Sequence, residues 1–309
     1  MKLFNKSREE IYNEPEGIMG ANTVVLADDM LTVITEPKRI IPGQFDAFGT
    51  EFEGHAFYEA SSIRKIDDTY YFIYSSEKSN ELCYATSKYP DKDFKYRGTI
   101  ISNGDIGYKG RKAEDRLNMT ANNHGSIEYI NGQWYVFYHR HTHSSTFSRQ
   151  ACAEPVTILS DGTIPQVEIT SSGLNNGPLL AKGEYSAVIA CNITNDHMPH
   201  ARNQMVDEDI PFITHDDSNR FITGIQEGTL IGYKYFQFDG KIQLKVTTRG
   251  RGEGRFIVST EADTIGEIGI ESTENWTENL VEINAKGTQD LYLTFEGNGR
   301  FELLNIKFE

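Results

Sequence analysis

Two residues that could carry acid–base chemistry, Glu59 and His124, stand just ahead of the two copies of an internal repeat. Phe57 and Tyr58 precede the glutamate, and desolvation by aromatic neighbours raises the pKa of a carboxyl group, which suits it to donate a proton near neutral pH. A histidine on a polar axis can hold a metal ion or an ordered water, or bond a substrate hydroxyl. A surface glutamate and a structural histidine are the simpler interpretations of each residue alone. Their shared place ahead of the repeat favours a common site.

The repeat itself has an offset of 64 residues, since residues 63–74 align without a gap on residues 127–138. Each copy consists of a short alternating segment, a polar turn and an aromatic-rich run. Such a pattern predicts two strands joined by a turn, used twice. Repeated small sheets with ionisable groups at the same end of successive units are typical of a β-propeller with its active site on the axis.

The rest of the chain also has the texture of an all-β protein, with no window that favours a long amphipathic helix. After about residue 220 the alternation becomes cleaner and the turns are tight and glycine-rich, which predicts an antiparallel, jelly-roll-like β-sandwich. We therefore expect a partial propeller over residues 1–170, a connection over 171–219 and a sandwich over 220–309. The strands expected in the first part are 57–66, 70–76, 81–87, 97–102, 124–130, 134–140, 147–153 and 156–160, with a hairpin at 23–34.

Arg149 and three alternating histidines are further candidates for the site. Arg149 lies in an otherwise small and apolar segment, so it needs either an acceptor in a cleft or a buried ion pair, for example with Glu154. His139, His141 and His143 would share one face of a strand and could bind Zn²⁺. Ligands on one strand are about 6–7 Å apart along the chain, which is awkward for one tetrahedral ion. A histidine such as His139 lining a sugar pocket is the favoured interpretation.

In the predicted sandwich, Tyr233, Tyr235 and Trp276 are candidates for stacking on sugar rings, because aromatic faces bind the apolar C–H faces of pyranoses. The alternative for each is a place in the hydrophobic core. Polar residues flank Trp276 on both sides, which favours an exposed position or a cleft for this ring.

Composition excludes several classes of function. The net charge of −15 argues against binding a nucleic acid, because nothing would replace the condensed counterions. No window approaches the ~20 apolar residues of a membrane span, and the first residues do not form a signal peptide, so a cytoplasmic protein is expected. Cys83, Cys152 and Cys191 are scattered and odd in number, which predicts reduced thiols rather than a disulfide framework.

Three motifs together resemble the family 43 glycoside hydrolases, which are five-bladed β-propeller enzymes acting on arabinose- and xylose-containing glycans. They are residues 57–63 (FYEASSI), 123–126 (NHGS) and 148–155 (SRQACAEP). The C-terminal motifs at 232–236 (GYKYF) and 301–308 (FELLNIKF) resemble a family 6 carbohydrate-binding sandwich. The resemblance implies an oligo- or polysaccharide ligand.

The resemblance also implies a mechanism that inverts the anomeric centre: a carboxylic acid protonates the leaving oxygen while a carboxylate across the site activates water. By motif, Glu59 matches the general acid and His124 the axial histidine near a central Ca²⁺ or water. Arg149 resembles the arginine that lines the sugar subsite. The chemistry requires no cofactor, and a Ca²⁺ ion near His124 would be structural.

The chain departs from the family pattern at its beginning. The family takes its general base and a second, pKa-modulating Asp from the first two blades, and only 58 residues precede Glu59. At 64 residues per unit, five blades need roughly 300 residues, but only about 170 precede the expected sandwich. We therefore expect that the first blade and much of the second are missing, and that the hairpin at 23–34 ends the second.

An incomplete propeller leaves strand edges that invite another chain, so we expect a complementing N-terminal segment or self-association. Catalysis needs a second carboxylate about 6.5–9.5 Å from Glu59. None of the nearby acids in the sequence stands at an equivalent blade start: they are Asp46, Glu51, Glu53 and Asp105. The alternatives to an enzyme are a non-catalytic carbohydrate-binding protein and the product of a truncated gene.

Overall fold

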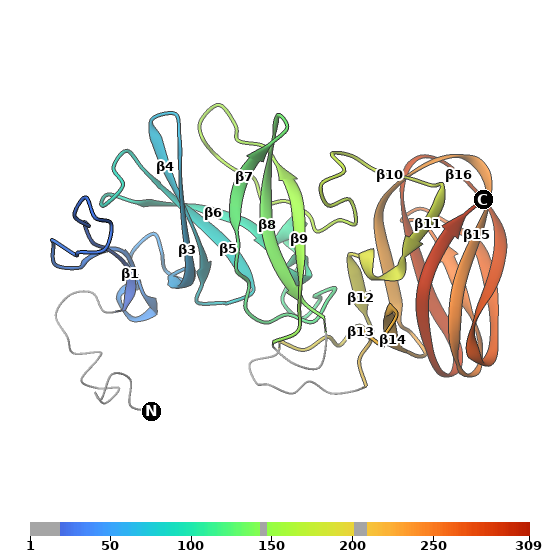
Figure 1. Cartoon of the computed structure of the whole chain (residues 1–309). Coiled ribbons are helices and arrows are strands. Elements are labelled where there is room, and N and C mark those ends of the chain that lie inside the picture. The colour runs from blue at the N-terminus through green and yellow to red at the C-terminus, as the bar shows by residue number, and fades with distance from the viewer. Residues whose placement is uncertain (1–18, 143–146, 201–208) are drawn as a thin grey trace. The chain divides into compact units, whose positions relative to one another are not determined.

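The computed structural model describes residues 19–142, 147–200 and 209–309, and these residues form an all-β protein (Figure 1). The helices among them are short 3₁₀ turns, and none of the described helices is long and apolar enough to cross a membrane. The 3₁₀ turns are η1 (Gln44–Asp46), η2 (Asn103–Asp105), η3 (Tyr108–Gly110) and η4 (Ala187–Ile189).

The chain divides into two compact units, and each unit draws on several stretches of sequence. The first unit contains the segments up to residue 102, 122–138 and 156–166, and the second contains 103–121, 139–155 and 167–309. The expected division at residue 170 is therefore simpler than the observed one.

The first unit contains a complete four-stranded antiparallel sheet with the order β3-β4-β5-β6. Its strands are β3 (Phe57–Ile66), β4 (Thr69–Ser76), β5 (Glu81–Ser87) and β6 (Lys95–Ser102). The two central strands are almost entirely buried, as their runs of aromatic and small residues predict. Phe72, Tyr74 and Cys83 pack in one hydrophobic cluster from these strands. The expected strands agree with the observed ones to within two residues.

A second sheet has the order β7-β8-β9, formed by β7 (Ser126–Ile130), β8 (Gln133–His141) and β9 (Arg149–Val156). The division between the two units falls within β8, after Tyr138. One strand, β9, replaces the two strands expected at 147–153 and 156–160.

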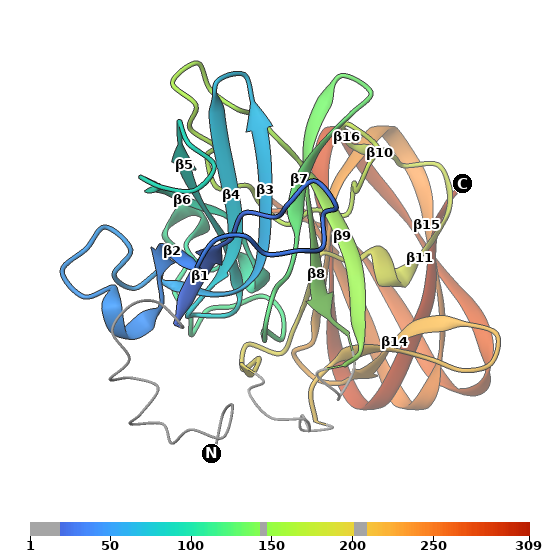
Figure 2. The same ribbon diagram turned by 60° about the vertical axis from the view of Figure 1, so that its left-hand side comes forward.

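The two copies of the repeat face each other through equivalent positions. Ser62 Oγ lies 2.7 Å from Ser126 Oγ, and Arg64 Nε donates a hydrogen bond to Glu128 Oε2 over 3.2 Å. Each pair is separated by 64 residues, the offset of the repeat. Figures 1 and 2 show β3 and β7 side by side. The repeat thus corresponds to two successive sheets whose first strands are in contact.

The expected hairpin at 23–34 is present between β1 (Gly20–Thr23) and β2 (Lys38–Pro42), which pair with each other. Leu26 and Val33 form an antiparallel bridge. On either side of it, the Ala27 N–H donates to the Thr32 carbonyl oxygen and the Ile34 N–H donates to the Val25 carbonyl oxygen. The carboxylate of Asp29 accepts three hydrogen bonds from the two residues that follow Met30, and these hold the turn. The apolar side chains of this segment are exposed, so no buried sheet face supports longer strands.

The second unit contains an antiparallel sandwich dominated by two long, bent strands, β15 (Leu230–Ser259) and β16 (Thr264–Phe308). From Leu244 on, most residues of β15 pair with two parts of β16, so that β16 runs along both sides of β15; Leu244, for example, pairs with both Val281 and Phe308. Where Gly252 pairs with Gly299, a Cβ on Gly252 would lie 2.1 Å from the Asn298 carbonyl oxygen, so only glycine fits.

Shorter strands complete the sandwich, in the order β10-β15-β16-β14-β13, with β11 paired to β16 and β12 to β15. They are β10 (Leu179–Leu180), β11 (Gly183–Ser186), β12 (Asn192–Thr194), β13 (Phe212–His215) and β14 (Arg220–Ile225). The segment expected to be a connection, 171–219, therefore supplies four strands of this sheet, and the sandwich begins well before residue 220.

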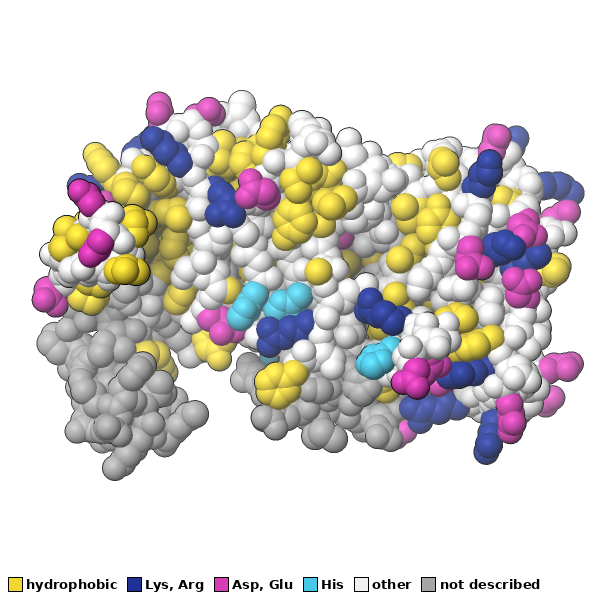
Figure 3. All heavy atoms as spheres, viewed as in Figure 1, with side chains coloured by type: hydrophobic (Ala, Val, Ile, Leu, Met, Phe, Trp, Pro, Cys, Tyr) yellow, Lys and Arg dark blue, Asp and Glu magenta, His cyan; other side chains and the backbone are white. Residues whose placement is uncertain are grey.

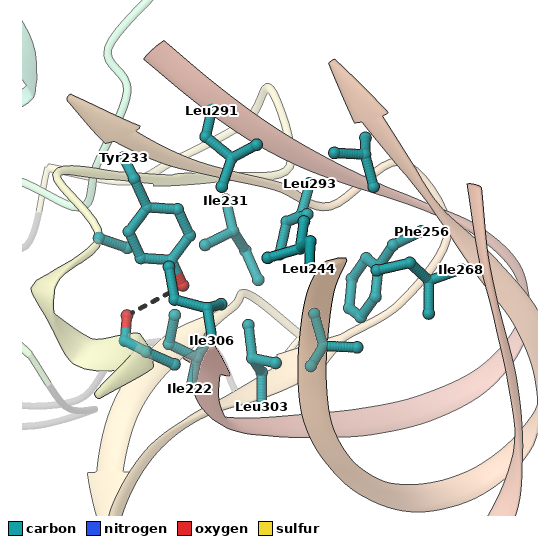
Figure 4. Close-up of a cluster of buried hydrophobic side chains, with 14 of the residues drawn as sticks. Ile222, Ile231, Tyr233, Leu244, Phe256, Ile268, Leu291, Leu293, Leu303 and Ile306 are labelled. Atoms are coloured by element: carbon teal, nitrogen blue, oxygen red, sulfur yellow. Dashed lines mark hydrogen bonds between the residues drawn. The ribbon is translucent and has the colours of Figure 1, made fainter. Parts of the chain in front are cut away.

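Side chains from alternate positions of these strands fill the core of the sandwich (Figure 4). Leu244, Phe256, Leu293 and Leu303 are completely buried there. Burial of each such side chain contributes roughly 1.5–3 kcal/mol to folding. The long strands are thus held by packing on one face, as the alternation of the sequence predicts.

Burial disfavours the charged form of one acid in the second unit, Asp105. Asp105 is 1% exposed, and its Oδ1 accepts a hydrogen bond from the backbone N–H of Ile169 over 2.8 Å. Its Oδ2 has no hydrogen-bond partner among the described residues. Burial raises the pKa of this carboxyl to about 6. The protonated form therefore favours the fold, and this contribution is present below the unfolded pKa of about 3.9 and lost as the pH rises through 6.

We predict that Asp105→Asn removes this pH dependence. The amide oxygen can still accept the bond from Ile169, and no charge is buried. The stability of the variant relative to the natural chain should rise by about 2–3 kcal/mol between pH 4 and pH 8, in urea unfolding at each pH. The control Asp239→Asn, an exposed residue, should give a difference independent of pH. Equal differences at both pH values for Asp105→Asn would contradict the prediction.

Close approach of two backbones requires glycine just before β7. A Cβ on Gly125 would lie 1.9 Å from the carbonyl oxygen of Phe137 and 2.8 Å from a methyl carbon of Leu82. The carbonyl oxygen of Phe137 belongs to the backbone, so it cannot move aside cheaply. Gly125 thus allows the chain that carries His124 to run against β8.

We predict that Gly125→Ala destabilises the chain by at least about 2 kcal/mol, because the overlap forces a backbone shift. The lowered midpoint should be visible in thermal and urea unfolding. Gly269→Ala is the matched control, since a Cβ there meets nothing within 4 Å, and it should change stability little. A Gly125→Ala chain as stable as this control would refute the close approach.

Candidate functional site

Glu59 is presented by an irregular stretch of β3. Phe57 pairs with Ser76, Glu59 with Ser75 and Ser62 with Ile73, so β3 carries one extra residue in each interval. Ala60, directly after the glutamate, has a left-handed backbone with φ of 65°. Such a conformation costs a residue other than glycine roughly 1–2 kcal/mol. Bulges re-aim side chains and recur next to active sites. The bulge therefore sets the direction of Glu59 independently of the strand alternation.

Glu59 and His124 are in direct contact, as their shared place in the repeat predicted they would be near. Glu59 Oε1 lies 2.7 Å from His124 Nε2, and the two side chains are 37% and 39% exposed. One proton held between these atoms makes either a neutral acid–imidazole pair or a carboxylate–imidazolium pair. The pair is open to solvent, so a substrate can reach the carboxyl group.

Asn122 joins the pair and was missed in the sequence. Its Nδ2 donates a hydrogen bond to Glu59 Oε1 over 3.4 Å and lies 3.5 Å from His124 Nε2. The signal was present, since Asn122 is the alternate neighbour of His124 and so can share its side of an extended chain. The three side chains form a cluster of one carboxyl group, one imidazole and one amide.

The acids nearest to Glu59 in the sequence are engaged elsewhere. Asp46 pairs with Arg39, and Glu51 pairs with Lys95 over 3.4 Å. The carboxylate of Glu53 accepts a bond from the Gly49 backbone N–H. The fourth, the buried Asp105, belongs to the second unit. Each of these four acids, none of which stands at an equivalent blade start, thus has a partner other than Glu59 among the described residues.

A Ca²⁺ ion near His124 stays a prediction. Calcium takes six to eight oxygen ligands, usually carboxylates, carbonyls and waters. The carboxylate of Glu59 and the side-chain amide of Asn122, both beside the His124 ring, carry oxygens of this kind.

His139 and Arg149 belong to the second unit and not to the unit of Glu59. His139 is half-buried, and its ring meets that of His141 edge-to-face at 5.5 Å. His143 lies outside the described residues. Arg149 is exposed at the start of β9, so the alternative of a buried ion pair with Glu154 is wrong. A place for His139 and Arg149 in a sugar subsite stays a prediction.

Glu154 has a structural role of its own. It is 1% exposed, and its carboxylate accepts bonds from the backbone N–H and the hydroxyl of Thr170, over 2.8 and 2.6 Å. These bonds link β9 to the segment that follows it in the second unit, and they account for a buried carboxylate in an apolar strand.

The structure contradicts the expectation that Tyr233 of the sandwich stacks on a sugar ring. It is completely buried in the core, where its hydroxyl donates a hydrogen bond to the Ala187 carbonyl oxygen over 3.2 Å (Figure 4). No face of this ring is open to a sugar. The alternation of β15 places Tyr233 on the inward face with Ile231, so the ring is part of the hydrophobic core.

Tyr235 and Trp276 are partly exposed, and each has a partner. The Tyr235 hydroxyl donates to Glu168 Oε2 over 2.6 Å, and burial together with this carboxylate raises the pKa of the phenol. The guanidinium of Arg249 lies 4.2 Å over the Trp276 ring, which also meets the edge of Phe221. A ligand would therefore meet at most one face of Trp276.

Comparison with known proteins identifies relatives of the chain. The family model described as "Glycosyl hydrolases family 43" matches residues 3–164. A "Xylosidase/arabinosidase" of Thermoclostridium stercorarium is 44% identical over 296 residues, which are 92% of this chain and 63% of that protein. An "Arabinoxylan arabinofuranohydrolase" of Paenibacillus polymyxa is 24% identical over 314 residues, 93% of this chain and 44% of the relative. The chain thus spans about half to two thirds of the length of these relatives.

Among solved structures, a family 43 arabinoxylan arabinofuranohydrolase from Bacillus subtilis matches 93% of this chain and 58% of its own, with a TM-score of 0.45 and 20% identity. A CBM6 module from Clostridium stercorarium, in complex with cellobiose, matches 43% of this chain and 98% of its own, with a TM-score of 0.35 and 18% identity. The family model alone covers just over half of the sequence and includes Glu59 and His124. The chain therefore belongs to glycosyl hydrolase family 43.

Proposed function

We propose that this protein hydrolyses glycosidic bonds in xylose- or arabinose-containing glycans, with Glu59 as the general acid. The observation that carries the proposal is the solvent-accessible pair of Glu59 and His124 on a bulged strand. The name of the Thermoclostridium stercorarium relative, a xylosidase/arabinosidase, supports the substrate class.

In the proposed reaction the Glu59 carboxyl proton passes to the glycosidic oxygen as its bond to the anomeric carbon breaks. A water attacks the opposite face of that carbon and gives its proton to a carboxylate base, which inverts the centre. Proton exchange with solvent then resets both carboxyl groups. His124 and Asn122 act as positioning residues that hold the carboxyl of Glu59 toward the leaving oxygen.

We propose further that the carboxylate base comes from blades supplied by a complementing N-terminal segment. The engaged state of the nearby acids supports this, and so does the surface ahead of β2. Hydrophobic side chains gather over the N-terminal strands (Figure 3). The exposed apolar residues there are Val24, Val25, Met30, Leu31, Val33 and Ile34.

A non-catalytic carbohydrate-binding protein is the second candidate, and the sandwich would then carry recognition through Tyr235 and Trp276. The partly exposed position of both rings favours it. Turnover distinguishes the two candidates, because binding needs no carboxylate across from Glu59. Aryl and natural xylosides and arabinofuranosides should be assayed with the chain alone, with and without Ca²⁺, and with a polypeptide that supplies the expected blades.

We predict that Glu59→Gln, in whichever of these preparations is active, lowers kcat by about 10²–10⁴-fold on an unactivated xyloside or arabinoside. The loss should be far smaller on nitrophenyl glycosides, because nitrophenolate leaves without protonation. Glu128→Gln removes an exposed carboxylate from the neighbouring β7 and should leave both activities unchanged. Equal losses on both substrates would count against Glu59 as the acid.

We predict that His124→Ala shows the same dependence on the leaving group, with a smaller loss of about 10-fold, if the imidazole acts through Glu59. The double variant Glu59→Gln/His124→Ala should then be no slower than Glu59→Gln alone, because two residues that act as a unit are not additive. Additive losses in this cycle, measured as kcat/KM on the unactivated substrate, would show that His124 acts separately.

A further inference from the structure

We propose that His55, Glu81 and Cys83 form a binding site for Zn²⁺ or a similar borderline-soft cation. The three side chains offer an imidazole nitrogen, a carboxylate oxygen and a sulfur, and these atoms all lie within 4.8 Å of one another. All three residues belong to the first unit. Glu81 and Cys83 are alternate residues of β5 and share one face of the strand, whereas His55 comes from the segment before β3.

The spacing of the three atoms approaches that of a tetrahedral site. Cys83 Sγ lies 3.4 Å from Glu81 Oε1 and 3.7 Å from His55 Nδ1. With metal–sulfur and metal–nitrogen bonds of about 2.3 and 2.0–2.1 Å, the sulfur edges of a tetrahedral Zn²⁺ site are about 3.5 Å long. The third edge, between His55 Nδ1 and Glu81 Oε1, is a hydrogen bond of 2.7 Å and must open by about half an ångström.

A second layer of side chains orients the carboxylate. The hydroxyl of Ser76 donates to Glu81 Oε1 over 2.6 Å, and that of Thr99 donates to Oε2 over 3.1 Å. The His55 ring stacks on Tyr96 at 4.9 Å. Hydrogen bonds to metal ligands from outside fix their orientation and tune affinity. The cluster is therefore held in place before any ion binds.

The chemistry of the donors selects the ion and excludes a nucleophilic role. A thiolate with an imidazole and a carboxylate suits Zn²⁺, whereas Ca²⁺ prefers oxygen alone. Cys83 is completely buried, and burial raises the pKa of its thiol, so it is neither accessible nor activated as a nucleophile. His55, which is 27% exposed, provides the approach for a small cation.

Binding changes the protonation of the cluster in a defined way. The thiol of Cys83 loses its proton to solvent, and the His55 proton moves from Nδ1 to Nε2 so that Nδ1 can bind the ion. The ammonium of Lys78, 3.3 Å from Nε2, must turn away, and its side chain is exposed enough to do so. Affinity should therefore rise with pH. The bound ion would tie the segment before β3, at His55 four residues before Glu59, to β5.

The test uses the full chain, kept reduced and freed of metal by dialysis against EDTA. Titration with Co²⁺ should give, at one equivalent, the thiolate-to-cobalt charge-transfer band and the intense visible absorption of a tetrahedral ion, and Zn²⁺ should displace it. Zn²⁺ should raise the melting temperature by several degrees, and Ca²⁺ should not. Cys83→Ser should abolish the thiolate band and weaken Zn²⁺ binding at least 10-fold.

Cys152→Ser is the matched control, because it removes a more exposed thiol outside the cluster, and it should keep both the band and the affinity. Absence of the thiolate band in the natural chain would overturn the proposal, as would unchanged Zn²⁺ affinity in Cys83→Ser. If Cys83→Ser fails to fold, Glu81→Gln replaces it, with an expected loss of affinity of at least 10-fold. These readouts do not depend on glycosidase activity, so the proposal stands or falls apart from the proposed function.

Discussion

The alignment of β3 beside β7, the first strands of two neighbouring sheets, is the constraint on which the candidate site depends. It pairs Ser62 with Ser126 and Arg64 with Glu128, and thereby brings the beginnings of the two strands together. The ion pair is largely exposed and contributes at most about 1 kcal/mol, so it does not hold the register by itself. Packing of the buried central strands and the close approach at Gly125 must fix it. Glu59 and His124 meet because these two sheets are built alike and set side by side.

Strands with one buried face or an aromatic-rich run could be predicted from the sequence, because period-2 alternation reports burial directly. The four strands of the first sheet and the all-β class were found in this way. The hairpin at 23–34 could be predicted as well, although most of its apolar side chains are exposed and hydrogen bonds to the Asp29 side chain shape its turn. Short strands such as β10 and β12 have too few residues to show a period, so the start of the sandwich was placed too late.

Site residues could be predicted where they lie beside the repeat. They could not be predicted where tertiary packing sets the position or direction of the side chain. The proximity of Glu59 and His124 followed from the offset of the repeat, but the bulge at Ala60 has no signature in the alternation. Tyr233 was misassigned because a strand aromatic looks the same in a core and in a cleft, and only the packed sheets separate the two. The relation of Glu81 to Cys83 is visible as an i, i+2 pair. The approach of His55, 26 residues earlier than Glu81, is not visible in the sequence.

The first unit contains two glutamate–histidine pairs with the same 2.7 Å contact, and their surroundings give them different chemistry. Burial alone would raise the pKa of Glu81, but the hydrogen bond from His55, the charge of Lys78 and the hydroxyl of Ser76 outweigh it and lower that pKa. Glu81 is therefore held as an anion, which suits a metal ligand and not a proton donor. Glu59 has a far more exposed carboxyl and, besides His124, an amide as its neighbour. A proton can reach and leave it, and a sugar oxygen can approach it, so the exposed pair suits the proposed acid catalysis and the buried pair suits the proposed cation binding.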